Sequence, residues 1–367
     1  MGGKIIDRRA YSILMDNNAS KNTNSHKFFK LWFNYEKPAI SLKNLLKQEL
    51  LSVLNLYLQS ISFQLNSESL GTLIDRQLNL LSLDRQRSLL ERRNAPERCC
   101  IAHEENFHKR AVSLLQNNNG HLFDMGSIPL CYSCPIGLIL APRLQISPKK
   151  VVEDLGNLLA RHSSNIESNL LLYLDTDPTG WLNFYVTERA IGNWLERSLW
   201  LFKTQAQNNS PLTSSQSDRC QKSDFSVQYI HARCCSLLRL GAREKLITLI
   251  DNNFNYAVWQ LTQPRSISWL DRQHHLWFER QSEYNLVRQL LIVTDSQTVN
   301  DRDRWSKLAL DLSQVTAIFL ADCRFLGEIK EQYPERAIAR LGLIALAQCW
   351  LQKILVEKLN CSAPTTL

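Results

Sequence analysis

One histidine pair in this chain has a spacing close to that of a catalytic metal site. His103 and His108 flank the sequence Glu-Glu-Asn-Phe. A helix that binds zinc through two histidines places them four residues apart, so that both imidazoles face one metal ion. Five residues turn a helix by about 140°, so the rings of His103 and His108 would point to different sides. The pattern predicts a solvated charged helix and no metalloprotease site.

Cysteines are the other residues with metal-binding or redox chemistry. Cys131 and Cys134 form a C-x-x-C pair, and Cys99, Cys100 and His103 lie upstream of it. Such a set could hold a structural zinc ion, or the pair could be redox-active. A single C-x-x-C is a weak pattern, however, and cysteine is also a common small buried side chain. The zinc site, the redox pair and ordinary core or surface cysteines therefore all stay open.

Phosphate-binding glycine loops are absent from the sequence. The 12 Gly never cluster as G-x-G-x-x-G or G-x-x-x-x-G-K, and no Ser stands in a G-x-S-x-G elbow. The alternating strands and helices with buried Val and Ile runs that a nucleotide-binding α/β domain needs are also missing. We therefore expect no bound cofactor, ATP included, and no catalytic residues.

A helix predicted over 227–240 carries side chains that suit RNA. Tyr229, Arg233, Ser236 and Leu240 follow one another along one face at steps of four and three residues. Arginine can pair with phosphate, and both arginine and tyrosine can stack on unpaired bases. Rim residues of a helical bundle show the same spacing, so this face by itself indicates either RNA contacts or packing.

The opposite side of the same helix is apolar, which indicates that it faces a core. Its apolar residues are Val227, Ile230, Cys234, Leu237 and Leu238. His231 falls between Val227 and Cys234, so we expect a buried histidine with satisfied hydrogen bonds, or a hinge.

Composition favours a mainly helical fold. The 12 Gly and 11 Pro among 367 residues are about half of average usage, too few for the many turns of an all-β protein. The net charge of +8 and pI near 9.0 permit nucleic-acid binding, but the charge is spread along the chain. No secretory signal and no apolar run of about 20 residues is present. We expect a cytoplasmic protein with reduced thiols and no membrane segment.

The order of patterns along the chain predicts two domains. Residues 1–40 read as a mobile leader, and 41–203 as a small α+β domain that begins with a helix over 41–58 capped by Ser41. The apolar residues of this helix form one stripe, which comprises Leu42, Leu45, Leu46, Leu50, Val53, Leu54, Tyr57 and Leu58. Ser147 and Pro148 start another helix of this domain, and residues 169–187 read as strand, turn, strand.

A second predicted domain follows a flexible linker. The linker, 204–224, is rich in Ser, Gln and Asn. Residues 225–367 read as a helical bundle that ends in a long amphipathic helix. The apolar face of that helix comprises Leu343, Leu346, Ala347, Trp350, Leu351, Ile354 and Leu355.

The segment Phe225–Arg239 reads Phe-Ser-Val-Gln-Tyr-Ile-His-Ala-Arg-Cys-Cys-Ser-Leu-Leu-Arg. It resembles the entry helix of the C-terminal DALR anticodon-binding domain of arginyl-tRNA synthetases, which reads Val-Gln-Tyr-Ala-His-Ala-Arg, then Cys-Ser-Ile-Leu-Arg. The matching positions are Val227, Gln228, Tyr229, His231, Ala232, Arg233, Ser236, Leu238 and Arg239. Phe319–Gly327, which contains Arg324, resembles the family's Phe-Tyr-x-x-Cys-Arg-Val-Leu stretch. Arg340–Leu343 and Leu359–Pro364 resemble its last helix and tail.

The resemblance extends to the other side of the linker. Pro135–Leu144 followed by Ser147–Glu153 is similar to two successive helices in the N-terminal additional domain of the same synthetases. Gly180–Phe184 stands where that family has Gly-Phe-Ile-Asn-Phe. By this resemblance, 41–58 is the first helix of the domain, and about 60–125 is an insertion that the family does not usually carry.

The chain departs from the family where the enzyme should be. In the family, a class I catalytic domain with the ATP-holding HIGH and KMSKS signatures lies between the two regions. Here the interval is the linker, no His begins a His-x-Gly-His/Asn run, and Lys-Met-Ser-Lys-Ser is absent. The tail also ends in Thr-Thr-Leu where the family typically ends in Met. The sequence resembles the two tRNA-binding domains of a synthetase without the catalytic domain that lies between them.

The resemblance implies a tRNA-binding protein without ligase activity of its own. The bundle would face the anticodon stem and loop, the α+β domain would face the D-loop corner, and the tRNA could be arginine-accepting. The implied tRNA-binding residues are Tyr229, Arg233, Arg239 and Arg324. Two alternatives stay open: a helical protein-interaction module that kept the fold and lost RNA binding, and the tRNA-binding subunit of a split synthetase that works with a separate catalytic chain.

Overall fold

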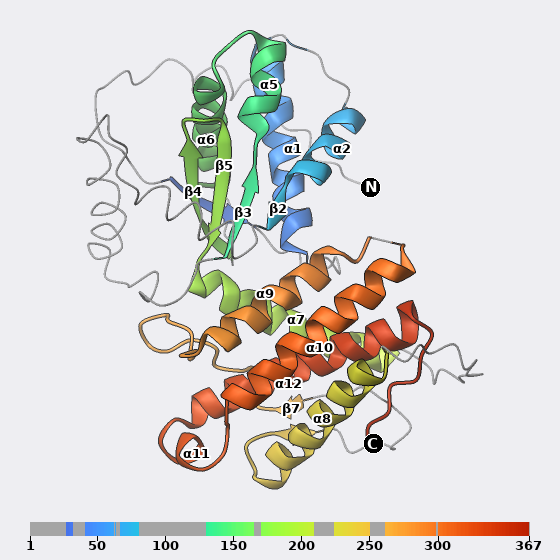
Figure 1. The fold of residues 1–367 in the computed structure, drawn as a ribbon. Coiled ribbons are helices and arrows are strands. Elements are labelled where there is room, and N and C mark those ends of the chain that lie inside the picture. Colours follow the sequence, from blue (N-terminus) through green and yellow to red (C-terminus); the bar gives the residue numbers. More distant parts are fainter. Residues whose placement is uncertain are drawn as a thin grey trace, which may run out of the picture.

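The structure, a computed structural model, is mainly helical with a small sheet region, which confirms the predicted fold class (Figure 1). The residues that it describes are 27–31, 41–61, 63, 67–80, 130–164, 170–208, 224–249, 261–298 and 300–366.

The described elements form two units. The sheet unit comprises β1 (Lys27–Leu31), α1 (Leu42–Ser60), α2 (Ser67–Gln77), β2 (Asn79–Leu80), β3 (Cys131–Cys134), α5 (Ile136–Leu144), α6 (Pro148–Ser164), β4 (Leu170–Asp177) and β5 (Trp181–Val186). The helical unit comprises α7 (Glu188–Asn208), α8 (Asp224–Arg243), β6 (Thr248–Leu249), β7 (Leu261–Gln263), α9 (Gln281–Asp295), α10 (Arg302–Asp322), α11 (Glu328–Gln332) and α12 (Pro334–Lys353), which continues into a π-helical turn at Ile354–Lys358.

An antiparallel sheet organises the first unit. Its strands lie in the order β1-β4-β5-β3-β2, and α1 and α6 pack against it. Buried residues such as Leu172 and Leu174 alternate with half-buried Tyr173 on β4. This period of two places the apolar side chains on one face of the sheet. The predicted strand–turn–strand over 169–187 is thereby confirmed.

The two predicted helix starts of the sheet unit are also confirmed. Ser41 Oγ accepts from the backbone N–H of Asn44 at 3.1 Å, and Ser147 Oγ accepts from that of Lys150 at 3.3 Å. The apolar positions of the 41–58 pattern are the buried positions of α1, namely Leu42, Leu45, Leu46, Leu50, Val53, Leu54, Tyr57 and Leu58.

The predicted leader over 1–40 contains a strand, which corrects that prediction in part. Residues 27–31 form β1, and β1 pairs antiparallel with β4 from Lys27↔Leu174 to Leu31↔Leu170. Five residues are too few for a sequence pattern to stand out, but the free edge of β4 supplies the hydrogen-bonding partners. The rest of the predicted leader lies outside the described residues.

The start of the predicted insertion over 60–125 takes part in the sheet unit. α2 packs on α1, and β2 pairs with β3 through Asn79↔Ser133 and Leu80↔Tyr132. Residues 81–129 lie outside the described residues, so the extent of the insertion stays a prediction.

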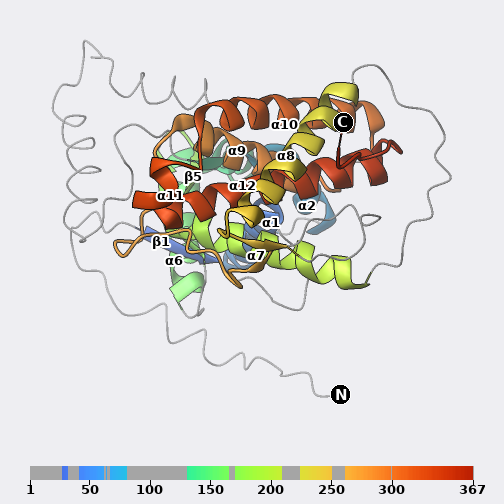
Figure 2. The same cartoon turned by 90° about the horizontal axis from the view of Figure 1, so that it is seen from below.

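α12 is the central helix of the helical unit. It contacts α7, α8, α9, α10 and α11, and Figure 2 shows it between α10 and α7. All of its residues from Arg336 to Leu351 except Ile338 are buried. The prediction of an amphipathic helix therefore needs correction, because α12 has partners on every side. Pro334–Lys358 is long and apolar enough to cross a membrane, but it is mostly buried inside the protein, like the core helix of a soluble protein.

α7 connects the two units. It follows β5 directly, yet it packs on α12, with Phe202 edge-on to Trp350 at a ring distance of 5.4 Å. α7 extends to Asn208, so the first residues of the predicted linker over 204–224 are helical. Residues 209–223 lie outside the described part of the chain, and α8 begins at Asp224.

We predict that Gly342→Ala destabilises the protein. A Cβ atom there would press on Ile267 Cδ1 and lie 2.6 Å from Trp269 Cη2, so the segment that precedes α9 could no longer pack on α12. Overpacking of this kind costs about 1–3 kcal/mol of unfolding free energy, which chemical denaturation would measure.

Gly71→Ala is the matched control. It also adds a methyl group to a helix, but its Cβ would find only Leu51 Cδ1 at an ordinary 3.8 Å. Alanine is the better helix former by up to about 1 kcal/mol, so this variant should be as stable as the parent or more so. Equal unfolding free energies for the two variants would contradict the prediction.

Candidate RNA-binding surface

α8 lies with one side in the core of the helical unit, as its apolar pattern predicts. Val227, Cys234 and Leu238 are almost fully buried, and α8 packs along α12 and α10. Gly241 lies against the side chain of Leu341 on α12, which brings the C-terminal turn of α8 close to that helix.

The outer side of α8 carries the polar residues that the sequence placed on a separate face. Tyr229 is 52% exposed, and Arg233 and Ser236 are also exposed. Ser236 Oγ donates to the carbonyl of Ala232 at 3.0 Å, so this hydroxyl is partly occupied by its own helix. Leu240, at the end of the row, is half-buried. The ring of Tyr229 and the guanidinium of Arg233 are thus one helical turn apart on the same exposed surface.

Beside Tyr229, the surface is hollowed into an open groove of about 470 Å³ between α8 and α10. Its lining is mostly apolar or uncharged and consists of Phe225, Ser226, Tyr229, Ile230, Leu310, Ser313, Gln314 and Ala317. Phe225 at 60% exposure and Tyr229 are large aromatic side chains that a monomeric fold gains nothing from exposing. The groove can therefore take a flat apolar group. We name the exposed face of α8 and this groove the α8–α10 surface.

Three polar residues of the family-like motif bind the C-terminal tail of the chain. Gln228 Nε2 donates to the carbonyl of Ser362 at 2.9 Å, and Arg239 Nη1 donates to that of Thr365 at 3.0 Å. Between them, His231 Nδ1 lies 2.9 Å from the carbonyl oxygen of Pro364. The sequence predicted Arg239 as a tRNA contact, and in the structure part of its guanidinium is occupied by the tail.

His231 is a fully buried histidine with a partner on each ring nitrogen. Because the Pro364 carbonyl can only accept, Nδ1 carries the proton, and Nε2 then accepts from the Gln348 side-chain amide at 2.9 Å. A protonated ring would place an N–H against that amide donor. Burial lowers the pKa of His231 to about 4, although the Pro364 carbonyl favours the charged form. The expectation of a buried histidine with satisfied hydrogen bonds is confirmed.

Arg324 lies apart from the α8–α10 surface. It follows α10 in the connection to α11, beyond the residues of α10 that line the groove. Its side chain is exposed, and its backbone carbonyl accepts from Arg340 Nη1. The structure therefore brings Tyr229 and Arg233 together and leaves Arg324 at another place on the helical unit.

The cysteine pair that could have held zinc lies in the sheet. Cys131 and Cys134 are both buried in β3, and burial raises the pKa of the Cys134 thiol to about 12. Among the described residues, no cluster of three or more His, Cys, Asp or Glu side chains could hold a metal ion. Cys99, Cys100, His103 and His108 lie outside the described residues.

In the sheet unit, the residues that resemble the synthetase domain form a tight turn and a buried polar group. Gly180 has φ +100°, and its carbonyl accepts from the N–H of Gly137 at 3.0 Å, a close approach that leaves no room for a side chain at either position. Asn183 Oδ1 accepts from Ser133 Oγ at 2.7 Å. Asn183 is 5% exposed, so its amide is engaged inside the sheet unit.

Sequence reasoning did not identify the groove or the tail contacts. The groove needs residues of α10, some 80 positions further along the chain than Tyr229, and nothing in the local pattern of α10 indicates it. The tail contacts had a usable signal: Gln228, His231 and Arg239 are polar residues on or beside the buried side of a helix, and such residues need partners.

One comparison connects this chain with a protein of known function. The chain is 29% identical over 153 residues to an arginine–tRNA ligase of Gloeobacter violaceus, and the alignment covers 40% of this chain and 23% of the ligase. The chain thus spans less than a quarter of that relative's length. The similarity supports a relation to the arginyl-tRNA synthetase family. No protein-family profile and no solved structure matches the chain.

We predict that His231 makes the protein less stable in mild acid. The folded-state pKa of about 4 lies below the ordinary value of 6.5, so the unfolded chain binds more protons between these two pH values. The unfolding free energy therefore falls as the pH drops through this window, by about 3 kcal/mol in all.

Urea unfolding at pH 7 and pH 5 would measure this effect. His231→Gln, which keeps an amide donor for the tail, should lose less stability on acidification than the parent. His274→Asn, which removes an exposed imidazole from a position with φ +67°, should behave like the parent. An unchanged pH dependence in His231→Gln would contradict the prediction.

Proposed function

We propose that this chain is a tRNA-binding protein, built like the non-catalytic domains of arginyl-tRNA synthetase and without ligase activity of its own. The observation that carries the proposal is the exposed pair Tyr229 and Arg233 beside the apolar groove, on the helix that resembles the entry helix of the family's anticodon-binding domain. The similarity to an arginine–tRNA ligase supports it.

The α8–α10 surface has the chemistry that single-stranded RNA requires. An unpaired nucleotide presents the flat π-face of its base, which stacks on an aromatic ring, and a phosphate, which pairs with a guanidinium. Tyr229 and Phe225 supply exposed rings, and Arg233 supplies the charge one helical turn away. The loop of an RNA hairpin offers both groups at once, so we propose the anticodon loop as the ligand of this surface.

We propose that the sheet unit contacts the same tRNA at its D-loop corner, as the family resemblance implies. This second contact would give the chain more RNA-binding surface than α8 and α10 provide alone. Arg324, which is exposed near α11, is proposed as an outlying backbone contact. The proposed tRNA is arginine-accepting, as the similarity to a ligase for that tRNA suggests.

Two other functions have an observation in their favour. The apolar lining of the groove and the exposure of Phe225 would also suit a protein partner, as in a helical interaction module. The match to only 23% of the length of a ligase would suit a subunit that works with a separate catalytic chain. Salt dependence separates RNA from the first alternative, because phosphate contacts weaken steeply with added salt. Co-purification with a synthetase would favour the second.

We predict that the purified chain prefers tRNA to duplex RNA at about 0.15 M salt, where weak charge attraction is largely screened. Arg233→Ala should weaken tRNA binding about tenfold. It should also make the slope of log binding constant against log salt concentration about one unit shallower, because one phosphate contact is lost. Fluorescence anisotropy with an arginine-accepting tRNA, an unrelated tRNA and a duplex would measure both quantities.

Arg272→Ala is the matched control for that measurement. Arg272 is an exposed arginine on the segment before α9, so its removal changes the net charge equally without touching the α8–α10 surface. Equal weak binding to all three RNAs, or equal losses in the two variants, would exclude the proposed surface.

We also predict no arginine-dependent aminoacylation by the purified chain. The sequence has no HIGH or KMSKS signature and no Gly-rich loop, so nothing in it would hold ATP. Charging of tRNA with labelled arginine and ATP, with an intact arginyl-tRNA synthetase as the positive control, would test this. Charging above trace rates would refute the prediction.

A further inference from the structure

Asp295, the last residue of α9, joins the helical unit to the sheet unit. Its Oδ1 accepts from Ser41 Oγ at 2.7 Å and from the backbone N–H of Lys43 at 3.2 Å. Its Oδ2 accepts from the hydroxyl of Tyr132 at 2.6 Å. All three donors belong to the sheet unit, from the start of α1 and from β3.

This is a costly place for a carboxylate. The C-terminal end of a helix carries partial negative charge, so α9 itself disfavours an anion there. Burial raises the pKa of Asp295, and the hydrogen bonds from Tyr132, Ser41 and Lys43 act in the opposite direction. The stabilising groups thus come from the other unit, and Asp295 would lose them if the two units separated.

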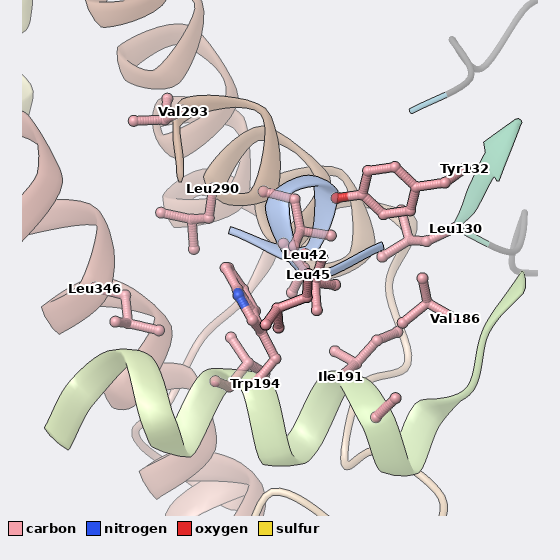
Figure 3. Packing of buried hydrophobic residues seen from close by; sticks show 14 of the residues in the cluster. Leu42, Leu45, Leu130, Tyr132, Val186, Ile191, Trp194, Leu290, Val293 and Leu346 are labelled. Atoms are coloured by element: carbon pink, nitrogen blue, oxygen red, sulfur yellow. The ribbon is translucent and has the colours of Figure 1, made fainter. Parts of the chain in front are cut away.

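The junction between the two units also has an apolar core. In Figure 3, Trp194 of α7 points towards Leu42 and Leu45 at the start of α1, and Leu290 of α9 lies near its ring. These side chains form one continuous core across the two units. Apolar contacts stabilise the junction but tolerate sliding, whereas hydrogen bonds with defined donors select one orientation.

Two further carboxylates, both on α7, hold the helix that follows the sheet. Glu188, two residues after β5, accepts from the N–H of Leu276 at 2.8 Å and from the hydroxyl of Tyr284 at 3.1 Å. Two turns later, Glu196 accepts from the Trp269 indole at 3.1 Å. These bonds lie within the helical unit and hold α7, which continues directly from the sheet, against α9 and the segment before it.

We propose that Asp295 is a positioning residue that fixes the sheet unit in one orientation on the helical unit, so that the two units present RNA with one rigid surface. We call this fixed orientation of the two units the lock. The lock follows from the contacts of Asp295, and its use in RNA recognition rests on the proposed function. When the RNA contacts of the two units are held at a fixed distance from each other, they select an RNA whose shape matches that distance. This fixed arrangement also avoids the entropy that a flexible connection would lose on binding.

The first arm of the test needs no RNA. Tyr132→Phe removes one donor to Asp295 and keeps the ring, and Asp295→Ala removes the acceptor. Hydrogen exchange of the full chain should become at least tenfold faster in the first turn of α1 and the last turn of α9 in both variants. Tyr57→Phe, which removes the hydroxyl of a buried tyrosine on the α6 side of α1, is the control and should leave exchange there unchanged.

The second arm compares a whole tRNA with its isolated anticodon hairpin on the same proteins. Tyr132→Phe should bind the whole tRNA about tenfold more weakly and the hairpin equally well, because only the whole tRNA reaches both units.

The outcomes separate the lock from the proposed function. Unchanged exchange in both variants would overturn the lock. Faster exchange with unchanged affinity for whole tRNA would overturn its role in RNA recognition. If the parent protein binds neither RNA, the proposed function fails, and the exchange arm alone decides whether the lock exists.

Discussion

The burial of α12 on every side is the constraint on which the helical unit depends. A helix without a solvent face needs apolar neighbours all round, and α7, α8, α9 and α10 supply them. Its buried polar residues need partners as well. Arg340 pairs with the fully buried carboxylate of Glu283 at 2.8 Å, and Gln348 pairs with His231. Removing one member of such a buried ion pair typically costs about 3–5 kcal/mol, so these contacts fix how α8 and α9 lie on α12.

This constraint divides the family-like motif of α8 into two sets with different tasks. His231, buried against α12, binds the tail, and Gln228 and Arg239 bind it on either side. Tyr229 and Arg233, with the smaller Ser236, are exposed and leave surface for a ligand. A match to a binding motif therefore does not make each matching residue a binding residue. Several of them build the helix–tail contact that supports the surface.

The two units differ from independent domains that only a linker connects. The sequence indicates a boundary at the polar stretch 204–224, but the chain crosses between the units earlier, from β5 into α7. The apolar core is continuous there, and Asp295 accepts from donors of the sheet unit. Glu188 and Glu196 in turn hold α7 against α9 and the segment before it. The two units therefore pack against each other through an apolar core and defined hydrogen bonds.

Local patterns in the sequence determined the mainly helical class, the caps at Ser41 and Ser147, the buried positions of α1 and the exposure of Tyr229 and Arg233. Helix periodicity and capping depend on residues within a few positions of each other, so the sequence alone reveals them. Only the tertiary structure decided the pairing of β1 with β4, the groove with α10, the tail on α8 and the lock at Asp295. Each of these joins residues about 80 to 250 positions apart, and no local pattern records which distant donor or apolar face will complete a site.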